Sequence, residues 1–528
     1  MLSVWRRWAA NNLRTARRFS SARIKMSRTY ADAVASLNTL QSNFAIVEAI
    51  RKSRMSMNKL AIPEMIKWVQ KTGYQPDDFN RMDLIHIAGT KGKGSTSAFI
   101  SSVLSQYIGK HPDSGTGSSL QKIGLYTSPH LRFVRERIQI NNQPLTEEQF
   151  AQYFFEIWDR LEASAVQEGQ DPAVKPVYFQ FLTLMAFHTY MREGVDAAVI
   201  ECGIGGEYDS TNIITKPVVT GITNLAIDHT GVLGGTIEEI AWHKAGIMKE
   251  GAKCFTVVQR EAARKVLEKR AREKGVDLEV VPIHAELQSD SVPLGLSASF
   301  QKTNASLAIA VSHNFLTQRG YTDIGTAPLN DSFKQGLKDV CWGGRCETRH
   351  ENGIKWCIDG GHTLESIELV GKWFAEQVSN TISANQRSER KRALIFNQQT
   401  RDANALARAL HATLAAALGD EKPFTHAIFC TNTTFKDTGF RPDLVSVNTN
   451  AEEVKELSVQ KGLARAWDEI DSGTDVKVVG TIQEAVEIVR EVAKDGEGEG
   501  EGKGEVMALV TGSLHLVGGL LEVLESNP

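Results

Sequence analysis

The 528-residue chain lacks the patterns that mark disulfide-rich, membrane-spanning and nucleic-acid-binding proteins. Its six cysteines form no Cys-X-X-Cys pair, so neither a zinc knuckle nor a disulfide framework is indicated, and reduced thiols are expected. The most apolar stretch, residues 506–521, is broken by polar residues and glycines, which predicts a strand, a loop and a helix rather than a transmembrane segment. A net charge of −3, without a basic stripe that carries aromatic residues, gives no basis for nucleic-acid binding.

Acidic residues are absent from residues 1–31, although this segment contains eight arginines and lysines. Serines and apolar residues lie between the charges, as in an amphipathic mitochondrial presequence. A disordered basic tail is the alternative interpretation. Met26 offers a second start that would omit most of the segment. The expected locations are therefore the mitochondrion, in the matrix or at the inner membrane, and the cytoplasm.

The remaining chain alternates strand-like and helix-like segments, which is typical of a parallel α/β sheet. Its length favours two domains, and we place the boundary so that they comprise residues 32–340 and 341–528. The low-complexity Gly/Glu segment 494–505 cannot bury a core and is predicted to be disordered. The first domain is predicted to contain the strands Leu84–Ala88, Ile123–Thr127, Ala197–Glu201, Val218–Thr223 and Lys253–Val258. The second is predicted to contain Lys355–Asp359, Arg392–Asn397 and Ala427–Cys430.

A glycine-rich turn with two lysines follows the first strand, within residues 84–96, and a helix-like segment follows it. Backbone N–H groups of Gly92, Lys93 and Gly94 can converge on a phosphate, because glycine has no side chain to crowd the approach. Lys93 would neutralise the outer phosphates, and the Ser95 hydroxyl can reach Mg²⁺. Gly94 separates Lys93 from Ser95, unlike the usual P-loop. A simple strand-to-helix turn is the alternative, but the lysine favours ATP binding.

Two further side chains follow apolar strands, at the edge where open α/β sheets bind ligands. Glu201 ends an apolar strand, where an acid is costly unless it meets a cation or a hydrogen-bond donor. It is therefore a candidate Mg²⁺ ligand, with a buried salt bridge as the alternative. His229, shortly after the next strand, is a second candidate ligand, with a structural role as the alternative. Composition alone makes Lys244 an ordinary lysine of a surface helix.

Cationic residues near other strand ends are candidates for binding anions. Ser128 and His130 flank a proline directly after a strand, and Arg132 and Arg137 lie in the stretch beyond, where they could hold an anionic substrate. In the second domain, Arg345 could reach phosphates across a cleft as a planar donor. Asp359 and His362 surround a Gly-Gly turn between a strand and a helix, where capping of that helix is the alternative role.

Seven motifs recur in one order and together resemble the folylpolyglutamate synthase family of the Mur-ligase superfamily, in its eukaryotic form. The likeness runs from about residue 31 to the C-terminus. Its motifs are Gly89–Ser95, Ser128–His130, Glu201–Gly206, Asp228–Thr230, Ala241–Ile247, Asp359–Thr363 and Thr511–Gly518.

The resemblance implies a P-loop, Mur-ligase-like ATPase domain with a mostly parallel sheet, followed by a smaller Rossmann-like α/β domain. It implies an ATP-dependent ligase that adds L-glutamate to the γ-carboxylate of a reduced folate through an acyl phosphate. Dihydrofolate synthase, which uses dihydropteroate, is the alternative within the enzymes. A P-loop regulatory ATPase that ligates nothing is the alternative from another class.

The resemblance also implies roles for individual positions. The residues that would bind ATP are Gly92, Lys93, Gly94, Ser95, Asn304, Arg345 and Asp359. The ligands of Mg²⁺ would be Ser128, Glu201 and His229. The residues nearest the chemistry would be Lys93, His362 and Lys244, the last as a carbamate that helps to bind a second metal. The contacts to folate would be His130, Arg132, Arg137 and Ser513. The protein is expected to be a monomer that uses ATP, glutamate and reduced folate with Mg²⁺ at two sites, and with room for a monovalent cation.

Overall fold

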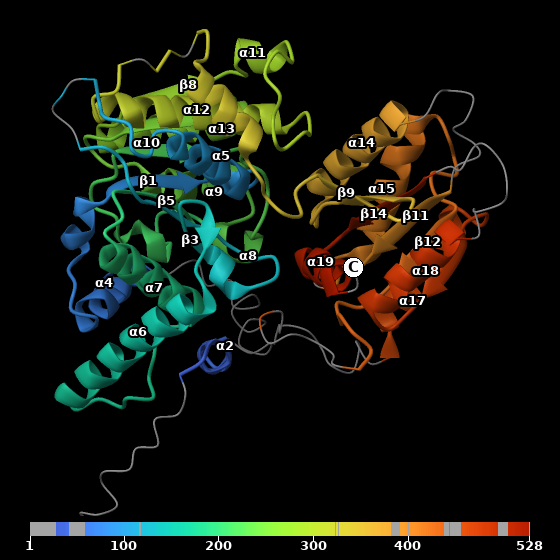
Figure 1. The fold of residues 1–528 in the computed structure, drawn as a ribbon, viewed down its shortest axis with the longest axis horizontal. Helices are drawn as coiled ribbons and strands as arrows, with labels where there is room; N and C mark the ends of the chain where they lie inside the picture. Colours follow the sequence, from blue (N-terminus) through green and yellow to red (C-terminus); the bar gives the residue numbers. More distant parts are fainter. Residues whose placement is uncertain are drawn as a thin grey trace, which may run out of the picture.

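The computed structural model describes residues 28–41, 59–113, 115, 118–322, 324–325, 327–381, 391–399, 401–437, 443, 456–494 and 505–526. Most of the basic segment 1–31, with Met26, and residues 495–504 of the Gly/Glu segment lie outside this range. The described residues form two α/β units, each built on one sheet (Figure 1). Among these residues, no helix is both long and apolar enough to cross a membrane.

The first unit has an eight-stranded sheet in the order β4-β3-β2-β5-β1-β6-β7-β8. Neighbouring strands from β2 to β8 are parallel, and β3 and β4 add an antiparallel edge. The strands are β1 (Asp83–Ala88), β2 (Ile123–Tyr126), β3 (Ile138–Ile140), β4 (Gln143–Pro144), β5 (Ala197–Glu201), β6 (Val219–Ile222), β7 (Lys253–Val257) and β8 (Leu278–Val281). The α-helices are α2 (Tyr30–Asn38), α4 (Ala61–Lys71), α5 (Lys93–Ser105), α6 (Glu147–Gln167), α7 (Tyr178–Glu193), α8 (Thr230–Leu233), α9 (Ile237–Lys244), α10 (Glu261–Lys274), α11 (Ala285–Gln288), α12 (Gln301–Gln318) and α13 (Asp331–Asp339). Short 3₁₀ turns are η1 (Pro76–Arg81), η2 (Val134–Arg137), η3 (Ser210–Ile213) and η4 (Ala245–Ile247).

The second unit has a six-stranded sheet in the order β13-β12-β11-β14-β10-β9, parallel except for the edge strand β9. Its strands are β9 (Glu347–Glu351), β10 (Ile354–Ile358), β11 (Arg392–Phe396), β12 (His426–Phe429), β13 (Asp475–Val478) and β14 (Val506–Thr511). Its helices are α14 (Leu364–Thr381), α15 (Ala403–Leu418), α17 (Ser458–Ile470), α18 (Ile482–Lys494) and α19 (Leu514–Ser526). The prediction of two α/β units with mostly parallel sheets is confirmed. The boundary placed near residue 340 falls between α13 and β9.

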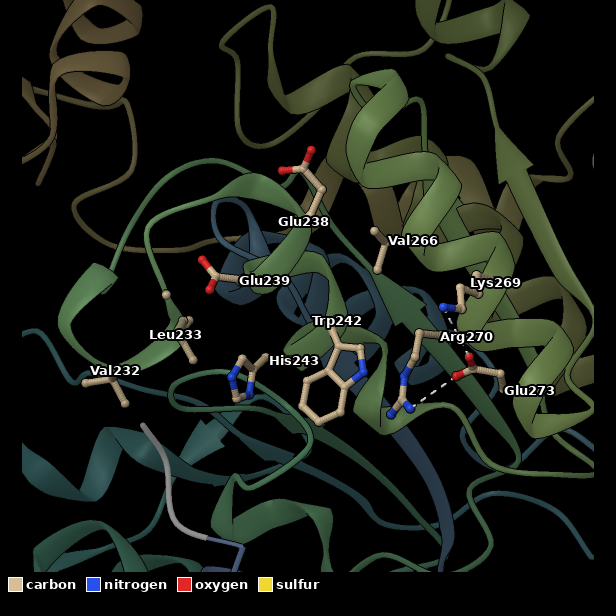
Figure 2. Close-up of a pocket in the computed structure, with 11 residues that line it drawn as sticks. Val232, Leu233, Glu238, Glu239, Trp242, His243, Val266, Lys269, Arg270 and Glu273 are labelled. Carbon is tan, nitrogen blue, oxygen red and sulfur yellow. Dashed lines mark hydrogen bonds and ion pairs between the residues drawn. The ribbon is translucent and has the colours of Figure 1, made fainter. Parts of the chain in front are cut away.

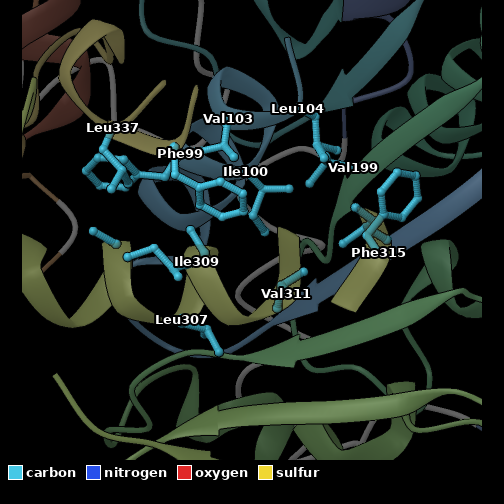
Figure 3. Packing of buried hydrophobic residues seen from close by; sticks show 14 of the residues in the cluster. Phe99, Ile100, Val103, Leu104, Val199, Leu307, Ile309, Val311, Phe315 and Leu337 are labelled. Atoms are coloured by element: carbon cyan, nitrogen blue, oxygen red, sulfur yellow. The ribbon is translucent and has the colours of Figure 1, made fainter. Parts of the chain in front are cut away.

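Side chains of the central strands point alternately to the two faces of the first sheet, and each face has its own hydrophobic core. Ile85 and Ile87 of β1 belong to the cluster that also contains Phe99 of α5 and Leu307 of α12 (Figure 3). Leu84 belongs instead to the cluster under α6 and α7. Successive strand residues point to opposite faces, so a strand apolar throughout can support helices on both sides. This packing fixes the carboxyl ends of β1 and β5, where the candidate site lies.

Candidate active site

The glycine-rich turn joins β1 directly to α5, as the sequence predicts. Gly92 adopts a φ of 87°, and a Cβ atom at this position would lie 2.2 Å from Oδ1 of Asn304. The N–H groups of Thr90 and Lys91 are held by the carbonyl of Asn224, at 2.9 and 3.1 Å. Only glycine therefore fits at the N-terminus of α5, where a phosphate would meet backbone N–H groups and the positive end of the helix dipole.

Trp342 explains the departure from the usual P-loop spacing. A Cβ atom at Gly94 would lie 3.2 Å from Nε1 of Trp342, which belongs to the connection between the two units. The extra glycine thus leaves room for the indole beside the phosphate loop. Arg345 lies three residues further along the same connection. The loop and the connection that carries Arg345 are therefore in contact.

Glu201 and Ser128 come together at the ends of β5 and β2. The backbone N–H of Ser128 donates to Oε2 of Glu201 at 2.9 Å. The Glu201 side chain is buried, and burial raises its pKa, while the charges of Lys93, Arg345 and Arg137 oppose this shift. A buried carboxylate among cations is suited to a hard metal ion.

His229 lies at the N-terminus of α8, with a φ of 52°. Burial lowers the pKa of its imidazole to about 4, although Asp228 acts in the opposite direction. The neutral ring is the form that ligates metals. No group of three or more His, Cys, Asp and Glu side chains in the described part of the chain could hold a metal. The predicted ligands Ser128, Glu201 and His229 include only two residues of these types. Their role in binding Mg²⁺ therefore stays a prediction.

Asp228 belongs to one of the sequence motifs but was given no role there, and the structure shows that it links the two units. Its carboxylate accepts from Nζ of Lys91 at 3.0 Å and from the guanidinium of Arg401 at 2.9 Å. Burial alone would raise the pKa of the Asp228 carboxyl, but these cations and His229 hold it well below its usual range. Arg401 comes from the second unit, just before α15. The two residues are 173 positions apart, so the sequence carries no local signal for this pair, and only folding brings them together.

Lys244 is buried at the end of α9 instead of lying on a surface helix, with only 2% of its area exposed. Burial lowers its pKa to about 7, and the charge of Lys93 adds to this shift. Within the described residues, no carboxylate lies within ion-pair distance of its Nζ. Close backbone approach fixes its position: a Cβ atom at Gly246 would lie 2.2 Å from Cα of Glu207. The N–H of Glu207 also donates to the carbonyl of His243 at 2.7 Å.

A cavity of about 430 Å³ lies among α8, α9 and α10 and contains none of the predicted site residues (Figure 2). Trp242 and His243, the two residues before Lys244, line it. The guanidinium of Arg270 lies 4.6 Å from the ring centre of Trp242 and forms an ion pair with Glu207 at 2.5 Å. Helix α10 therefore stabilises α9 on this side, next to Lys244, which is the residue that α9 contributes to the candidate site.

In the second unit, Asp359 fastens the segment that carries Arg345. Its carboxylate accepts N–H groups from Cys346 and Gly361, each at 2.8 Å. It does not cap α14: the N–H of Thr363 donates to the Ser366 hydroxyl at 2.9 Å instead. Asp359 therefore holds the base of Arg345 through the adjacent Cys346, and its direct contact with ATP stays a prediction.

His362 does not cap α14 with its ring. Its Nδ1 donates to the carbonyl of Gly360 at 2.8 Å, which leaves Nε2 as the acceptor. Burial lowers the pKa of this imidazole to about 4, and the charges of Lys91, Arg401 and Arg345 contribute. A neutral histidine thus lies within the field of cations from both units.

Two predicted folate contacts form part of a hydrogen-bonded chain. Nε of Arg137 donates to Nδ1 of His130 at 2.9 Å, so Nε2 of His130 donates to the carbonyl of Asp443 at 2.8 Å. The Arg137 guanidinium lies over the ring of Tyr178, 5.4 Å from its centre. These contacts orient both side chains beside Ser128, and their folate role stays a prediction.

The other two predicted folate contacts have structural partners. Arg132 forms an ion pair with Glu522 at 2.6 Å and another with Glu525, both on α19 of the second unit. The Ser513 hydroxyl accepts the N–H of Leu516 at 3.5 Å, at the start of α19. Arg132 thus joins the two units, and Ser513 stabilises a helix end. A role of either in binding folate stays a prediction.

These features define a class: a two-unit α/β enzyme with a phosphate loop at the end of a central strand and cations from both units around it. No family model matches the sequence. The chain is 43% identical to the folylpolyglutamate synthase of Neurospora crassa over 502 residues, which cover 94% of this chain and 92% of that protein. It is also 43% identical to the folylpolyglutamate synthase of Saccharomyces cerevisiae S288c over 511 residues, 95% of this chain and 88% of that protein. The chain belongs to the folylpolyglutamate synthase family.

Solved structures agree in fold. Mycobacterium tuberculosis folylpolyglutamate synthase, complexed with ADP and AMPPCP, aligns with a TM-score of 0.66 at 21% identity. The alignment covers 94% of this chain and all of that one. An FPGS–AMPPCP–folate complex aligns with a TM-score of 0.60 at 23% identity, over 92% of this chain and 100% of that one.

The close contact at Gly246 generates a prediction about Lys244. Gly246→Ala should lower the free energy of unfolding by about 1–3 kcal/mol, because the new methyl group overlaps the Glu207 backbone. It should also reduce activity by displacing Lys244. Gly235→Ala is the matched control, since a Cβ atom there meets nothing within 4 Å. Urea unfolding of both variants tests this, and identical midpoints would contradict the packing.

Proposed function

We propose that the protein joins L-glutamate to the γ-carboxylate of a reduced folate through an amide bond, with conversion of ATP to ADP and phosphate. The observation that carries this proposal is the identity of 43% with folylpolyglutamate synthases along 94% of the chain. The phosphate loop and the cations around it supply the matching chemistry. One chain contributes both sides of the site, which supports a monomer.

The reaction needs an activated carboxylate, because a carboxylate ion is a poor electrophile. A γ-carboxylate oxygen attacks the γ-phosphorus, and ADP leaves as an acyl phosphate forms. The ammonium group of glutamate first loses one proton, and the resulting neutral amine attacks the acyl carbon. Phosphate leaves, and the nitrogen loses a second proton as the amide bond forms. The site must spread phosphate charge and exclude water, which would hydrolyse the acyl phosphate.

Residues of this chain fit these tasks. Lys93 at the start of α5 and Arg345 of the connection would bind phosphate oxygens and keep charge from accumulating. Nε2 of His362 carries no proton, so it can accept a hydrogen bond from the amino group of glutamate and orient it for attack. Asp359 keeps Arg345 in place through the backbone of its neighbour.

Mg²⁺ fits the chemistry of the residues at the strand ends. Glu201 and His229, with Ser128, would hold one ion, since they offer a buried carboxylate, a neutral imidazole and a hydroxyl. When bound, the ion would neutralise phosphate charge. A second site would involve Lys244.

Replacement of Lys93 tests the phosphate loop. Lys93→Ala should reduce turnover at least about a hundredfold, because it removes a fixed positive charge from the phosphates. Mass spectrometry of the products from ATP, glutamate and tetrahydrofolate measures this directly. Parallel reactions with dihydropteroate distinguish a dihydrofolate synthase, and ATP turnover that does not depend on glutamate would indicate a regulatory ATPase. Lys110→Ala, in a loop beyond α5, is the control. Wild-type turnover of a folded Lys93→Ala variant would refute the assignment.

We further propose that Lys244 carries a carbamate. Its neutral amine would attack CO₂, a nitrogen–carbon bond would form, and one proton would be lost. The buried position of Lys244 favours the neutral amine, and the nearby cations would stabilise the resulting anion.

Chemical rescue tests the carbamate. Lys244→Ala should be nearly inactive, and acetate should restore part of the activity, because a short carboxylate can occupy the vacated anionic position. The same salt should not affect Lys93→Ala, which lacks a cation instead. An unmodified ammonium group in a high-resolution structure of active, bicarbonate-equilibrated enzyme would rule the carbamate out.

We also propose two cellular locations, from the acid-free N-terminal segment and Met26. A fluorescent reporter fused to residues 1–45 should enter mitochondria, because its positive, amphipathic segment is suited to import. The same reporter that starts at Met26 should remain in the cytosol. Cytosolic fluorescence from both fusions would refute the presequence.

A further inference from the structure

Gln301 is buried at the first position of α12 and faces the phosphate loop, with 1% of its area exposed. Its Nε2 donates to Oγ of Ser95 at 3.3 Å, and its Oε1 accepts from Nδ2 of Asn304 at 2.7 Å. Ser95 and Asn304 are themselves buried. One amide therefore connects the two side chains that flank the turn around Gly92.

We infer that Gln301 is a positioning residue that fixes the Ser95 hydroxyl and the Asn304 amide relative to each other, so that the phosphate loop is arranged before the nucleotide binds. This inference rests on the proposed ATP-dependent function. Gln301 itself need not touch the nucleotide, since it acts through Ser95 and Asn304.

The hydrogen bond to Ser95 determines how that hydroxyl can act. A serine hydroxyl has one proton and two lone pairs. The N–H group of Gln301 occupies one lone pair, which leaves the other lone pair for a cation and the proton for a phosphate oxygen. A carboxylate at position 301 would instead take the proton of Ser95 and direct it away from the phosphate.

The hydrogen bond to Asn304 acts on the other side of the turn. With Nδ2 of Asn304 bound to Gln301, its Oδ1 stands against Gly92, where a Cβ atom would lie only 2.2 Å away. The orientation of the Asn304 amide is thus set by the same glutamine that holds Ser95. Loss of Gln301 would remove its hydrogen bonds to both Ser95 and Asn304. The nucleotide would then have to order the loop as it binds, which lowers the binding affinity.

The test measures binding of AMPPCP by calorimetry, with and without Mg²⁺. Gln301→Met, of similar size but without the amide, should weaken Mg²⁺-dependent binding roughly tenfold. Gln318→Met, at the exposed end of the same helix, is the matched control and should bind as the wild type does. Gln301→Glu keeps the acceptor for Asn304 and loses the donor for Ser95. It should also bind weakly, and it serves if the methionine variant does not fold.

A double-mutant cycle separates positioning from general stability. Ser95→Ala combined with Gln301→Met should weaken binding by less than the product of the two single losses, because both changes interrupt the same Ser95–Gln301 hydrogen bond. Multiplied losses, or wild-type affinity in the folded Gln301 variants, would overturn the inference. Failure of the wild-type protein to bind AMPPCP or to form product would refute the proposed function. A result confined to the Gln301 variants would refute only the positioning role, so the two failures are distinguishable.

Discussion

Charge buried at the carboxyl ends of the first sheet must be compensated, and the arrangement of the site follows from this constraint. An isolated ion in a protein interior is unfavourable unless an opposite charge or a hydrogen-bond donor accompanies it. Glu201 meets the N–H of Ser128 and lies in the field of Lys93 and Arg345. Asp228 meets Lys91 and Arg401 directly. Each buried acid thus brings the phosphate loop and a cation of the second unit to the same edge of the sheet.

Close packing at two glycines also fixes the positions of functional side chains. Lys244 and Asn304 reach their positions because Gly246 and Gly92 allow backbone and side chains to approach where a methyl group would overlap. Such contacts leave little freedom to the elements that carry the functional groups. The cavity beside Trp242 shows that this density is local: α9 is tightly fixed at Lys244, yet the two residues before it line open space.

The fold could be predicted from sequence because its central strands are largely apolar runs. The eight strands whose bounds were predicted are present, with ends within one residue, and the strand expected in residues 506–521 is β14. The strands β3 and β4 escaped prediction because they are only three and two residues long. The edge strands β8, β9 and β13 escaped it because they are partly exposed and contain charged residues. Glu201 could be singled out because an acid after an apolar strand is unusual. Lys244 could be recognised only from the family motif, because its burial depends on the distant loop at Glu207.

Side-chain partners that are far apart in sequence explain what could not be predicted. An arginine after a strand end resembles an anion site, but Arg132 meets Glu522 and Glu525, nearly 400 positions later. Arg401 also forms an ion pair with a distant acid, but its partner Asp228 adjoins His229 in the candidate site. Both arginines join the two units, one away from the phosphate loop and one through Asp228 and Lys91 to the loop itself. Because Asp228 binds a cation from each unit, the placement of Lys91 depends on how the second unit is seated. The phosphate loop is therefore coupled to the second unit through charge as well as through Trp342.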